Sequence, residues 1–591
     1  MSRAKSSPEP AAENRSFWEL SWTDRSIVAA ICLLQVPIIN AAGLRRAAEL
    51  MPWPDGLEYA ASAVNLAAGR GAVLHFGGYT YPSRYTVGYP LILDFFYRIS
   101  GREVPLLFVA TWVLGMLSVF FTFMLARMLF GRAAATIAAL LLTLSPVFVT
   151  YSSLVMSDVP TLCVTIFAAG MILAAAADEV PKGRNRLRLS RWLVFGLLAG
   201  FSTIIRPTNA TILVGLVLCV AMVPLENRDP RSLLKAAIAI AVGFAIPVAW
   251  QLHQNSINLG SAFASGYSWW VPEVYGAGGR TFSIAYLFGP TMPRNPHGNV
   301  VVYVMTLLGL DGMLGDRGDP RYFLYPFAAE VFALIGFVAI LRASERAGAR
   351  RILWFGLGYL AALAGLYCFY LFTDVAFILP AAFVLFMAAG AGAAVANGWM
   401  RDAIRNRNRS AGQLASAAGV IVLDALLVIS LASEAVVRLR AHPADSPMVD
   451  ALMSLESHLP HDATVVSNIS LQFLELYLPA ESRFVGLNSL DPGEQFTDYH
   501  LHRLYEKRAA GWNGAVPAVV FPGEQMSPAV VDSLAAAIGA RTPVFLLIAP
   551  PETPKYADSL KSELGELQKK FTVEPVAQNE AVAVYRITAR K

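Results

Sequence analysis

Two carboxylates lie close together in a short segment that follows the first apolar stretch of the chain. Asp55 and Glu58 are three positions apart within residues 53–59, so a helix would place both on one face. A carboxylate in this setting can act as a general base that takes a proton from a hydroxyl nucleophile. Asp55 is equally suited to cap the first turn of a short helix, and both interpretations stay open.

Aromatic and cationic side chains share this segment. Tyr59 follows Glu58 directly, and Arg84 and Tyr85 belong to the run Tyr81-Pro82-Ser83-Arg84-Tyr85. A guanidinium offers a fork of donors that stays charged, which suits a phosphate oxygen. We therefore consider Arg84, Tyr59 and Tyr85 as substrate-binding residues, with contact between Arg84 and lipid headgroups as the alternative.

Further acids occur at the starts of later apolar stretches. Asp158 lies in Ser157-Asp158-Val159-Pro160, where capping of the next helix is one explanation and pairing with Asp55 is another. Asp374 is a third acid in a similar position. The sequence does not decide whether a divalent metal such as Mg or Mn is used. If one is, Asp55 and Asp158 are its expected ligands.

The elements that position these residues are membrane-spanning helices. Of the 591 residues, 55% are hydrophobic and 15% are charged, whereas soluble domains carry about 25% charge. Stretches near twenty apolar residues can each cross about 30 Å of hydrocarbon as a helix. The sequence predicts about eleven spans, near residues 25–43, 104–129, 133–151, 158–178, 192–205, 208–224, 236–254, 322–341, 352–372, 375–398 and 413–436.

The distribution of basic residues predicts the orientation. Clusters of Arg and Lys resist translocation and face the cytosol. With a cytosolic N-terminus, every cluster between spans falls on the cytosolic side; the clusters cover residues 127–132, 182–191, 228–235, 342–351 and 401–409. This assignment requires 192–224 to be a hairpin whose Arg206-Pro207 apex lies near the outer surface, because proline ends the first helix. Snorkelling of Arg206 to headgroups stays open beside a role in binding.

The predicted domain organisation has three parts. Residues 1–24 form a cytosolic leader, and 25–436 form the membrane domain with long outer loops at 44–103 and 255–320. Residues 437–591 form a soluble extracytoplasmic α/β domain with a largely parallel sheet, because strand-like and helix-like segments alternate there. We predict strands at 464–467, 483–487, 518–521 and 544–548. The four cysteines all lie in apolar stretches, which leaves no disulfide framework or zinc site.

The motifs taken together resemble those of the GT-C membrane glycosyltransferases. The pattern runs from Asp55-x-x-Glu58-Tyr59 through Arg84 and Gly88-Tyr89-Pro90 to Ser157-Asp158-x-Pro160. It is most similar to bacterial relatives of the protein O-mannosyltransferases and of the aminoarabinose transferase that modifies lipid A. The resemblance covers roughly residues 20–400. It implies a polyprenyl-phosphate sugar donor, chemistry at the outer face, and a catalytic base in the first outer loop, matched by Asp55.

One departure from the family changes the expected phosphate site. Relatives often carry an arginine in a late Arg-aromatic-x-Leu-Pro run, and this chain reads Val375-Ala376-Phe377-Ile378-Leu379-Pro380 instead. Binding of the donor phosphate then falls to other cations, for which the candidates are Arg84, Arg206, Arg280 and Arg294.

The resulting expectation is an inverting glycosyltransferase of the bacterial cytoplasmic membrane. It would move a sugar from a polyprenyl-phosphate donor to a hydroxyl of a lipid, glycan or protein, with Asp55 as base, Asp158 and Glu58 as further catalytic residues, and Asp374 among the substrate-binding groups. Two other classes remain: a transporter or flippase for a lipid-linked glycan, and a non-catalytic envelope assembly protein. The small net charge of +5, without one broad basic patch, argues against a nucleic-acid partner.

Overall fold

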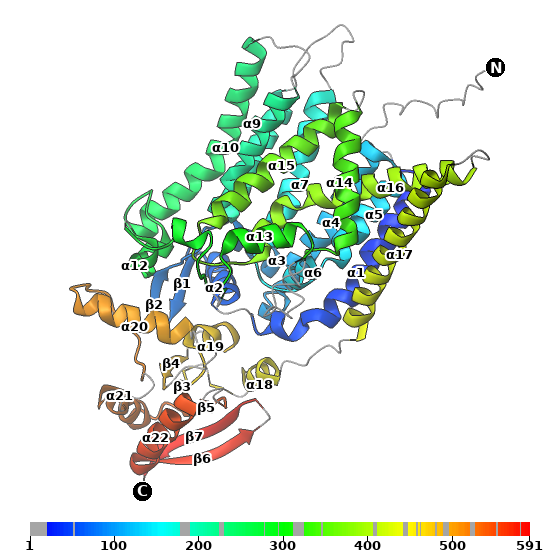
Figure 1. Ribbon diagram of the computed structural model, residues 1–591. Helices are drawn as coiled ribbons and strands as arrows, with labels where there is room; N and C mark the ends of the chain where they lie inside the picture. Colours follow the sequence, from blue (N-terminus) through cyan, green and yellow to red (C-terminus); the bar gives the residue numbers. More distant parts are fainter. Residues whose placement is uncertain are drawn as a thin grey trace, which may run out of the picture.

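The structure, a computed structural model, is a bundle of long helices with an α/β domain at one end (Figure 1). It describes residues 20–50, 54–177, 189–223, 230–276, 278–292, 295–310, 324–343, 347–405, 410–440, 447–456, 459–460, 462–478, 482–487, 496–520, 526, 528–550, 554–578 and 581–590. Most of the leader predicted at 1–24, and residues 311–320 of the second outer loop, lie outside these ranges.

Each of the eleven predicted spans coincides with helix in the structure. Among the described residues, seven helices are long and apolar enough to cross a membrane alone, and an eighth span arises if α5 and α6, bent by 63° at Ser145, are counted together. The three other predicted spans are the shorter helices α8, α9 and α14. The helices are α1 (Trp22–Ala48), α4 (Phe108–Phe130), α5 (Arg132–Leu144), α6 (Pro146–Ser152), α7 (Asp158–Ala177), α8 (Leu189–Ile205), α9 (Ile212–Met222), α10 (Pro230–Leu259), α14 (Phe327–Arg342), α15 (Ala347–Cys368), α16 (Phe383–Arg405) and α17 (Ala411–Arg440).

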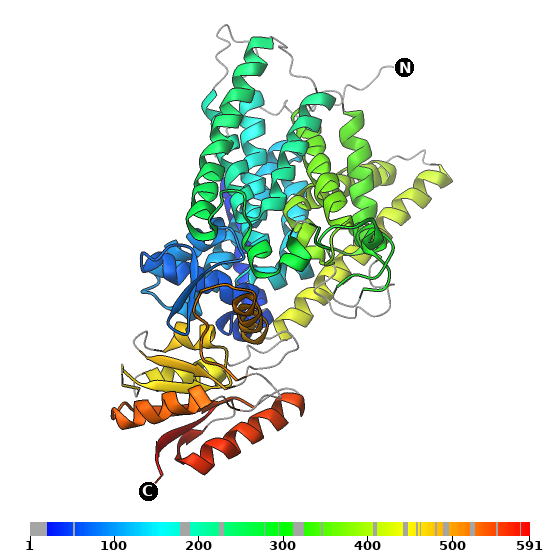
Figure 2. The same ribbon diagram turned by 90° about the vertical axis from the view of Figure 1, so that its left-hand side faces the viewer.

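Contacts at one end of the bundle agree with the predicted topology. Asp24 in the first turn of α1 is buried and forms ion pairs with Arg127 and Arg132, each with a 2.7 Å N–O distance. The start of the first span and the basic segment 127–132 therefore lie at the same end. The α/β domain lies at the opposite end from the start of α10 (Figure 2).

The predicted hairpin over 192–224 is present. Helix α8 ends at Ile205, Arg206 is extended with φ −150°, and the 3₁₀ turn η2 (Pro207–Thr211) leads into α9. Glycines let α10 approach α8 closely: a Cβ on Gly200 would stand 2.5 Å from the Phe244 carbonyl oxygen, and one on Gly243 2.3 Å from that of Leu193. Small residues at such crossings are typical of packed membrane helices. Only 11% of the apolar stretch of α10 is buried, so most of this helix faces outward.

The first outer loop folds into a compact layer on the bundle. It consists of α2 (Asp55–Ala67), the antiparallel hairpin of β1 (Val73–Phe76) and β2 (Tyr79–Pro82), α3 (Gly88–Ile99) and the turn η1 (Val104–Leu106). Gly77 and Gly78 turn the hairpin with positive φ, which glycine adopts without steric cost. The layer presents the side chains of α2 and of the segment after β2 toward the membrane domain.

The second outer loop packs on the first. It contains α11 (Gly266–Trp270), α12 (Pro272–Tyr275), η3 (Ile284–Tyr286) and α13 (Asn299–Leu307). Trp270 is fully buried and its Nε1 donates to the Pro82 carbonyl at 2.8 Å. A Cβ on Gly266 would stand 2.0 Å from the Ser83 carbonyl oxygen, so only glycine permits this approach of the two loops.

The C-terminal part is an α/β domain, but its sheet is mixed. The strand order is β4-β3-β5-β7-β6. Strands β4, β3 and β5 are parallel, and β7 pairs antiparallel with both β5 and β6. The predicted strand at 518–521 makes one bridge, from Val519 to Gly486. The elements are α18 (Pro447–Glu456), β3 (Thr464–Ser467), α19 (Leu471–Tyr477), β4 (Arg483–Gly486), α20 (Phe496–Ala509), α21 (Pro528–Gly539), β5 (Val544–Ile548), α22 (Pro554–Lys570), β6 (Phe571–Gln578) and β7 (Ala583–Ala589).

The α/β domain shares a hydrophobic core with the outer loops. One continuous cluster joins Leu57 of α2 and Trp270 of α11 to Phe473 of α19 and Leu501 of α20. A second cluster on the other face of the sheet, which includes Val485 and Leu546, contains only residues of this domain. The soluble part is therefore packed against the membrane part through its core and is not a separately tethered unit.

Candidate active site

The two acids of α2 occupy different environments. Glu58 is fully buried, and its carboxylate accepts from the Arg84 Nε at 2.6 Å and from the Arg84 backbone N–H at 3.1 Å. Burial raises the pKa of Glu58 to about 7, although the Arg84 charge opposes this rise. Asp55, one helical turn earlier, keeps 38% of its side chain exposed and lies 3.7 Å from the Arg84 Nη2. Its position suits contact with substrate, whereas Glu58 is placed to hold Arg84.

Tyrosines connect Asp55 to the segment that contains Asp158. Arg84 donates to the Tyr85 hydroxyl at 3.2 Å, and this hydroxyl donates to Asp55. The Tyr59 ring lies 4.3 Å from that of Tyr85, and its hydroxyl donates to Ser157 at 3.2 Å. Burial raises the pKa of Tyr59, and the negative charges of Asp55 and Asp158 add to the rise. Tyr59 therefore lies within electrostatic reach of both acids.

Asp158 and Arg206 form the second charged pair. Asp158 begins α7 with 1% of its surface exposed, and Arg206 from the hairpin apex donates to it. The guanidinium also lies 4.7 Å from the centre of the Phe377 ring and 5.8 Å from that of Tyr367. Phe377 belongs to η6 (Val375–Ala381). The hairpin apex therefore places a cation against this stretch, which contains no arginine of its own.

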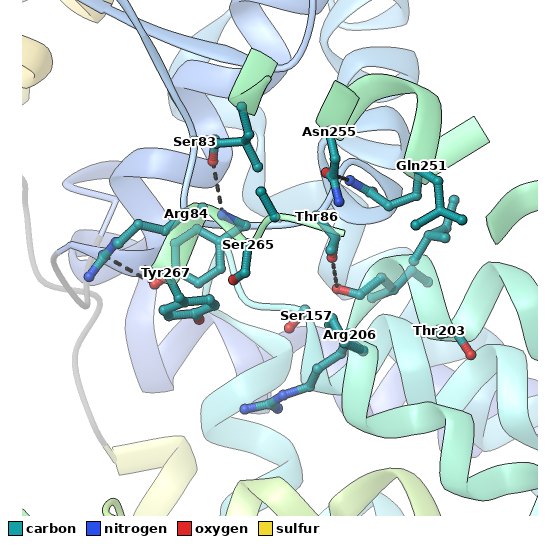
Figure 3. Close-up of a pocket in the computed structure, with 18 of the residues that line it drawn as sticks. Ser83, Arg84, Thr86, Ser157, Thr203, Arg206, Gln251, Asn255, Ser265 and Tyr267 are labelled. Carbon is teal, nitrogen blue, oxygen red and sulfur yellow. Dashed lines mark hydrogen bonds between the residues drawn. The ribbon is translucent and has the colours of Figure 1, made fainter. Parts of the chain in front are cut away.

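Of the predicted site residues, Asp55, Tyr59, Arg84, Tyr85 and Arg206 line one cavity of about 320 Å³ (Figure 3). Its polar end is formed by Asp55, Tyr59, Arg84, Tyr85, Ser157, Arg206 and Tyr267, and Figure 3 shows the guanidinium groups of Arg84 and Arg206 extending to the same side. Its other wall is largely apolar and comes from α8, α10 and the segment after α10, including Ile204, Val248, Leu252, Leu259 and Phe263. Glu58 and Asp158 lie behind this lining.

A pair of amides on α10 completes the cavity and was not singled out from the sequence. Gln251 accepts from the Val87 N–H at 2.8 Å and donates to Asn255 at 2.7 Å, and Asn255 donates to the Ala262 carbonyl at 3.2 Å. This relay joins the first outer loop to the second across α10, and Figure 3 shows the bond between Gln251 and Asn255. The signal in the sequence is two amides four residues apart at the end of an apolar helix, which place them on one face.

Two of the predicted substrate-binding residues, Asp374 and Arg280, lie away from the cavity. Asp374 caps η6 by accepting from the Ala376 N–H at 2.8 Å, and it accepts from the Tyr151 hydroxyl at 2.5 Å; it does not line the cavity. Arg280 is exposed after α12 and is also absent from the lining. Arg294 lies outside the described residues. Of the candidate cations in the part of the chain that the structure describes, Arg84 and Arg206 line the cavity.

The arrangement does not fit a metal ion. Among the described residues, no three or more His, Cys, Asp or Glu side chains come together as a ligand group. Asp55 and Asp158, the predicted metal ligands, are instead each adjacent to an arginine, whose charge opposes a cation at the same place.

Comparison with solved structures identifies the fold. ArnT from Cupriavidus metallidurans, bound to undecaprenyl phosphate, matches with a TM-score of 0.59 at 14% identity over 96% of this chain and 98% of that chain. The oligosaccharyltransferase from Archaeoglobus fulgidus in its apo form matches with a TM-score of 0.54 at 13% identity, over 96% and 75%. The same oligosaccharyltransferase, AglB, with an inhibitory peptide and a dolichol-phosphate, gives 0.52 at 13%, over 95% and 74%.

The fold is that of the GT-C membrane glycosyltransferases, and the resemblance expected from the motifs is confirmed. Residues 85–250 match the family model described as dolichyl-phosphate-mannose-protein mannosyltransferase. This range includes Asp158 and Arg206 and begins after Asp55. A search of curated protein sequences finds no match.

Proposed function

We propose that the protein transfers a sugar from a polyprenyl-phosphate donor to an acceptor hydroxyl at the outer face of the bacterial cytoplasmic membrane. The observation that carries this proposal is the composition of the cavity. Its polar end holds one partly exposed carboxylate and two arginines, and its apolar wall includes residues of the outward-facing helix α10. A lipid phosphate needs both, because its headgroup is charged and its chain stays in hydrocarbon.

The similar structures support the donor class. ArnT is bound to undecaprenyl phosphate, and AglB is in complex with a dolichol-phosphate. Both ligands combine a polyprenyl-type chain with a phosphate. In this chain, Arg84 and Arg206 are the cavity cations that would bind the phosphate, and the wall formed by Val248, Leu252 and Leu259 would contact the first part of the lipid chain.

The proposed reaction is a single displacement. The acceptor oxygen attacks the anomeric carbon while the bond from that carbon to the phosphate oxygen breaks, and the hydroxyl proton passes to Asp55. The electron pair of the broken bond stays on the polyprenyl phosphate, where the arginines stabilise the developing charge. Attack from the face opposite the leaving group inverts the anomeric configuration. Glu58 and Asp158 hold the two arginines in place by the contacts described above.

The proposal is tested by turnover of the purified protein with a panel of polyprenyl-phosphate sugars and candidate acceptors, with and without a chelator. We expect polyprenyl phosphate to be released with one class of donor only, and the product to carry the opposite anomeric configuration. Retention of configuration would contradict the single displacement. Lipid-linked sugar appearing across vesicles without cleavage would favour the flippase alternative.

A further inference from the structure

The α/β domain contacts the second outer loop through one face of α20. Leu501 and Leu504 of this helix are fully buried in the core that also holds Trp270 and Val271. Trp512, just after α20, lies 6.2 Å from Trp269 and 6.5 Å from Tyr81 between ring centres. Residues of the first outer loop, the second outer loop and the α/β domain therefore meet in one aromatic cluster.

Lys507 joins α20 to the end of α11. Its ammonium group donates to the Trp269 carbonyl and lies 3.9 Å from the centre of the Trp269 ring. A cation beside a ring face and a carbonyl at a helix end is attracted by both. Burial lowers the pKa of Lys507, with the Arg503 charge adding to this, as expected for a lysine held between two parts of the molecule.

Arg503, one turn earlier on α20, joins the same loop at α12. Its guanidinium donates to Glu273, the second residue of α12, and to Glu506 on its own helix. The Arg503 side chain is 20% exposed and that of Glu273 is 59% exposed. Lys507 and Arg503 thus hold two consecutive short helices of the second outer loop.

Helix α11, which Lys507 contacts, also contributes to the lining of the cavity. Helix α11 has five residues, and Tyr267 lies at its start while the carbonyl of Trp269 lies at its end. Tyr267 lines the cavity and packs edge-on against Tyr85, with ring centres 5.4 Å apart. Gly266 lies so close to the Ser83 backbone that a Cβ would not fit between them. A shift of α11 therefore also changes the distance between Tyr267 and Tyr85.

We propose that Arg503 and Lys507 are positioning residues through which the α/β domain holds α11 and α12 against the cavity. The domain thereby fixes where Tyr267 stands. This role goes beyond the proposed transfer reaction and applies whatever the cavity binds.

The test is hydrogen–deuterium exchange of the full-length protein in lipid nanodiscs, followed over residues 262–276. We expect Arg503→Glu and Lys507→Met to raise the exchange rate of this segment by about 2- to 5-fold, the range for loss of a rim ion pair. Arg508→Glu, a charge reversal at an exposed position of the same helix, should leave the rate unchanged. Lys507→Arg should also retain wild-type exchange.

Charge exchange separates positioning from general damage. Arg503→Glu combined with Glu273→Arg restores an ion pair of reversed polarity and should return the segment toward wild-type exchange, with the affinity for undecaprenyl phosphate recovering in parallel. Wild-type exchange in both Arg503→Glu and Lys507→Met, or no recovery in the double variant, overturns the proposal. If Arg503→Glu also raises the exchange rate of β3 and β5, the single variant Glu273→Arg decides, since it leaves the α/β domain unchanged. Faster exchange over residues 262–276 in this variant supports the proposal, and wild-type exchange overturns it.

Discussion

At the scale of single residues, the two acids of α2 differ in exposure: Asp55 lines the cavity, and Glu58 is buried and bonded to Arg84. Asp55, Arg84 and Arg206 do line one cavity, because apolar spans on either side return their loops to one surface. The sequence could not show that Glu58 is withdrawn behind Arg84, because burial depends on the hairpin and loop that cover α2. The Gln251 and Asn255 relay was missed for the same reason: its partners are backbone groups of distant loops.

The buried carboxylate predicts a pH dependence of ligand binding. The pKa of Glu58 is about 7, above its ordinary value of 4.5, because the group is buried. As pH falls from about 8 to 6, Glu58 takes up a proton and no longer neutralises Arg84, so a phosphate should bind more tightly. The affinity for a polyprenyl-phosphate sugar, measured at both ends of this range, should rise by up to about tenfold in the wild type, as expected for one pKa unit.

The matched variant for this prediction is Glu58→Gln, which cannot ionise. It should bind with an affinity that changes little between pH 6 and 8. An unchanged pH profile in this variant would assign the titration to another group.

At the scale of elements, the apolar stretches predicted the helices because each span needs about twenty residues to cross the bilayer. The strands β6 and β7 were not predicted. β6 has the sequence Phe571-Thr-Val-Glu-Pro-Val-Ala-Gln578 and is exposed along most of its length, so it lacks the alternation of a half-buried strand. Its Pro575 also lowers any strand prediction, although an edge strand tolerates it.

The close crossing of α8 and α10 predicts a sensitive position. In Gly243→Ala the new methyl group would meet the Leu193 carbonyl oxygen at 2.3 Å and the Leu197 nitrogen at 2.8 Å. The two helices must then separate, at a cost of about 1–3 kcal/mol. We expect a lower midpoint of thermal unfolding and, because α10 forms the cavity wall, weaker binding of undecaprenyl phosphate. Gly419→Ala in α17 is the control, since a Cβ there meets nothing within 4 Å.

At the scale of the whole molecule, the C-terminal α/β domain was predicted from the sequence, but the core that it shares with the outer loops was not. Contacts between residues as distant as Leu57 and Phe473 leave no local pattern, because each residue is simply apolar. The outer loops, the α/β domain and the mouth of the cavity form one packed body. Packing in this shared core offsets the conformational entropy that is lost when loops of this length are ordered.

This junction contains a second buried carboxylate with a predicted effect on stability. Glu475 of α19 accepts from the Gly77 N–H at 2.6 Å, and burial raises its pKa to about 8, while this hydrogen bond opposes the rise. Because the folded-state pKa exceeds the ordinary value of 4.5, the stability linked to this proton is lost as pH rises through about 8. Between pH 6 and pH 9, the midpoint of thermal unfolding should fall further in the wild type than in Glu475→Gln. Equal falls would contradict this assignment.

In the proposed reaction Asp55 takes the acceptor proton in the cavity, and substitution of two acids of the same loop tests this role. Turnover by Asp55→Asn is measured beside Asp94→Asn, an acid of the same outer loop that pairs with Arg98 on the surface of α3. We predict that Asp55→Asn loses about 10²- to 10⁴-fold in turnover while binding donor and unfolding at the wild-type temperature, and that Asp94→Asn stays active. Near wild-type turnover by a folded Asp55→Asn variant would contradict the account.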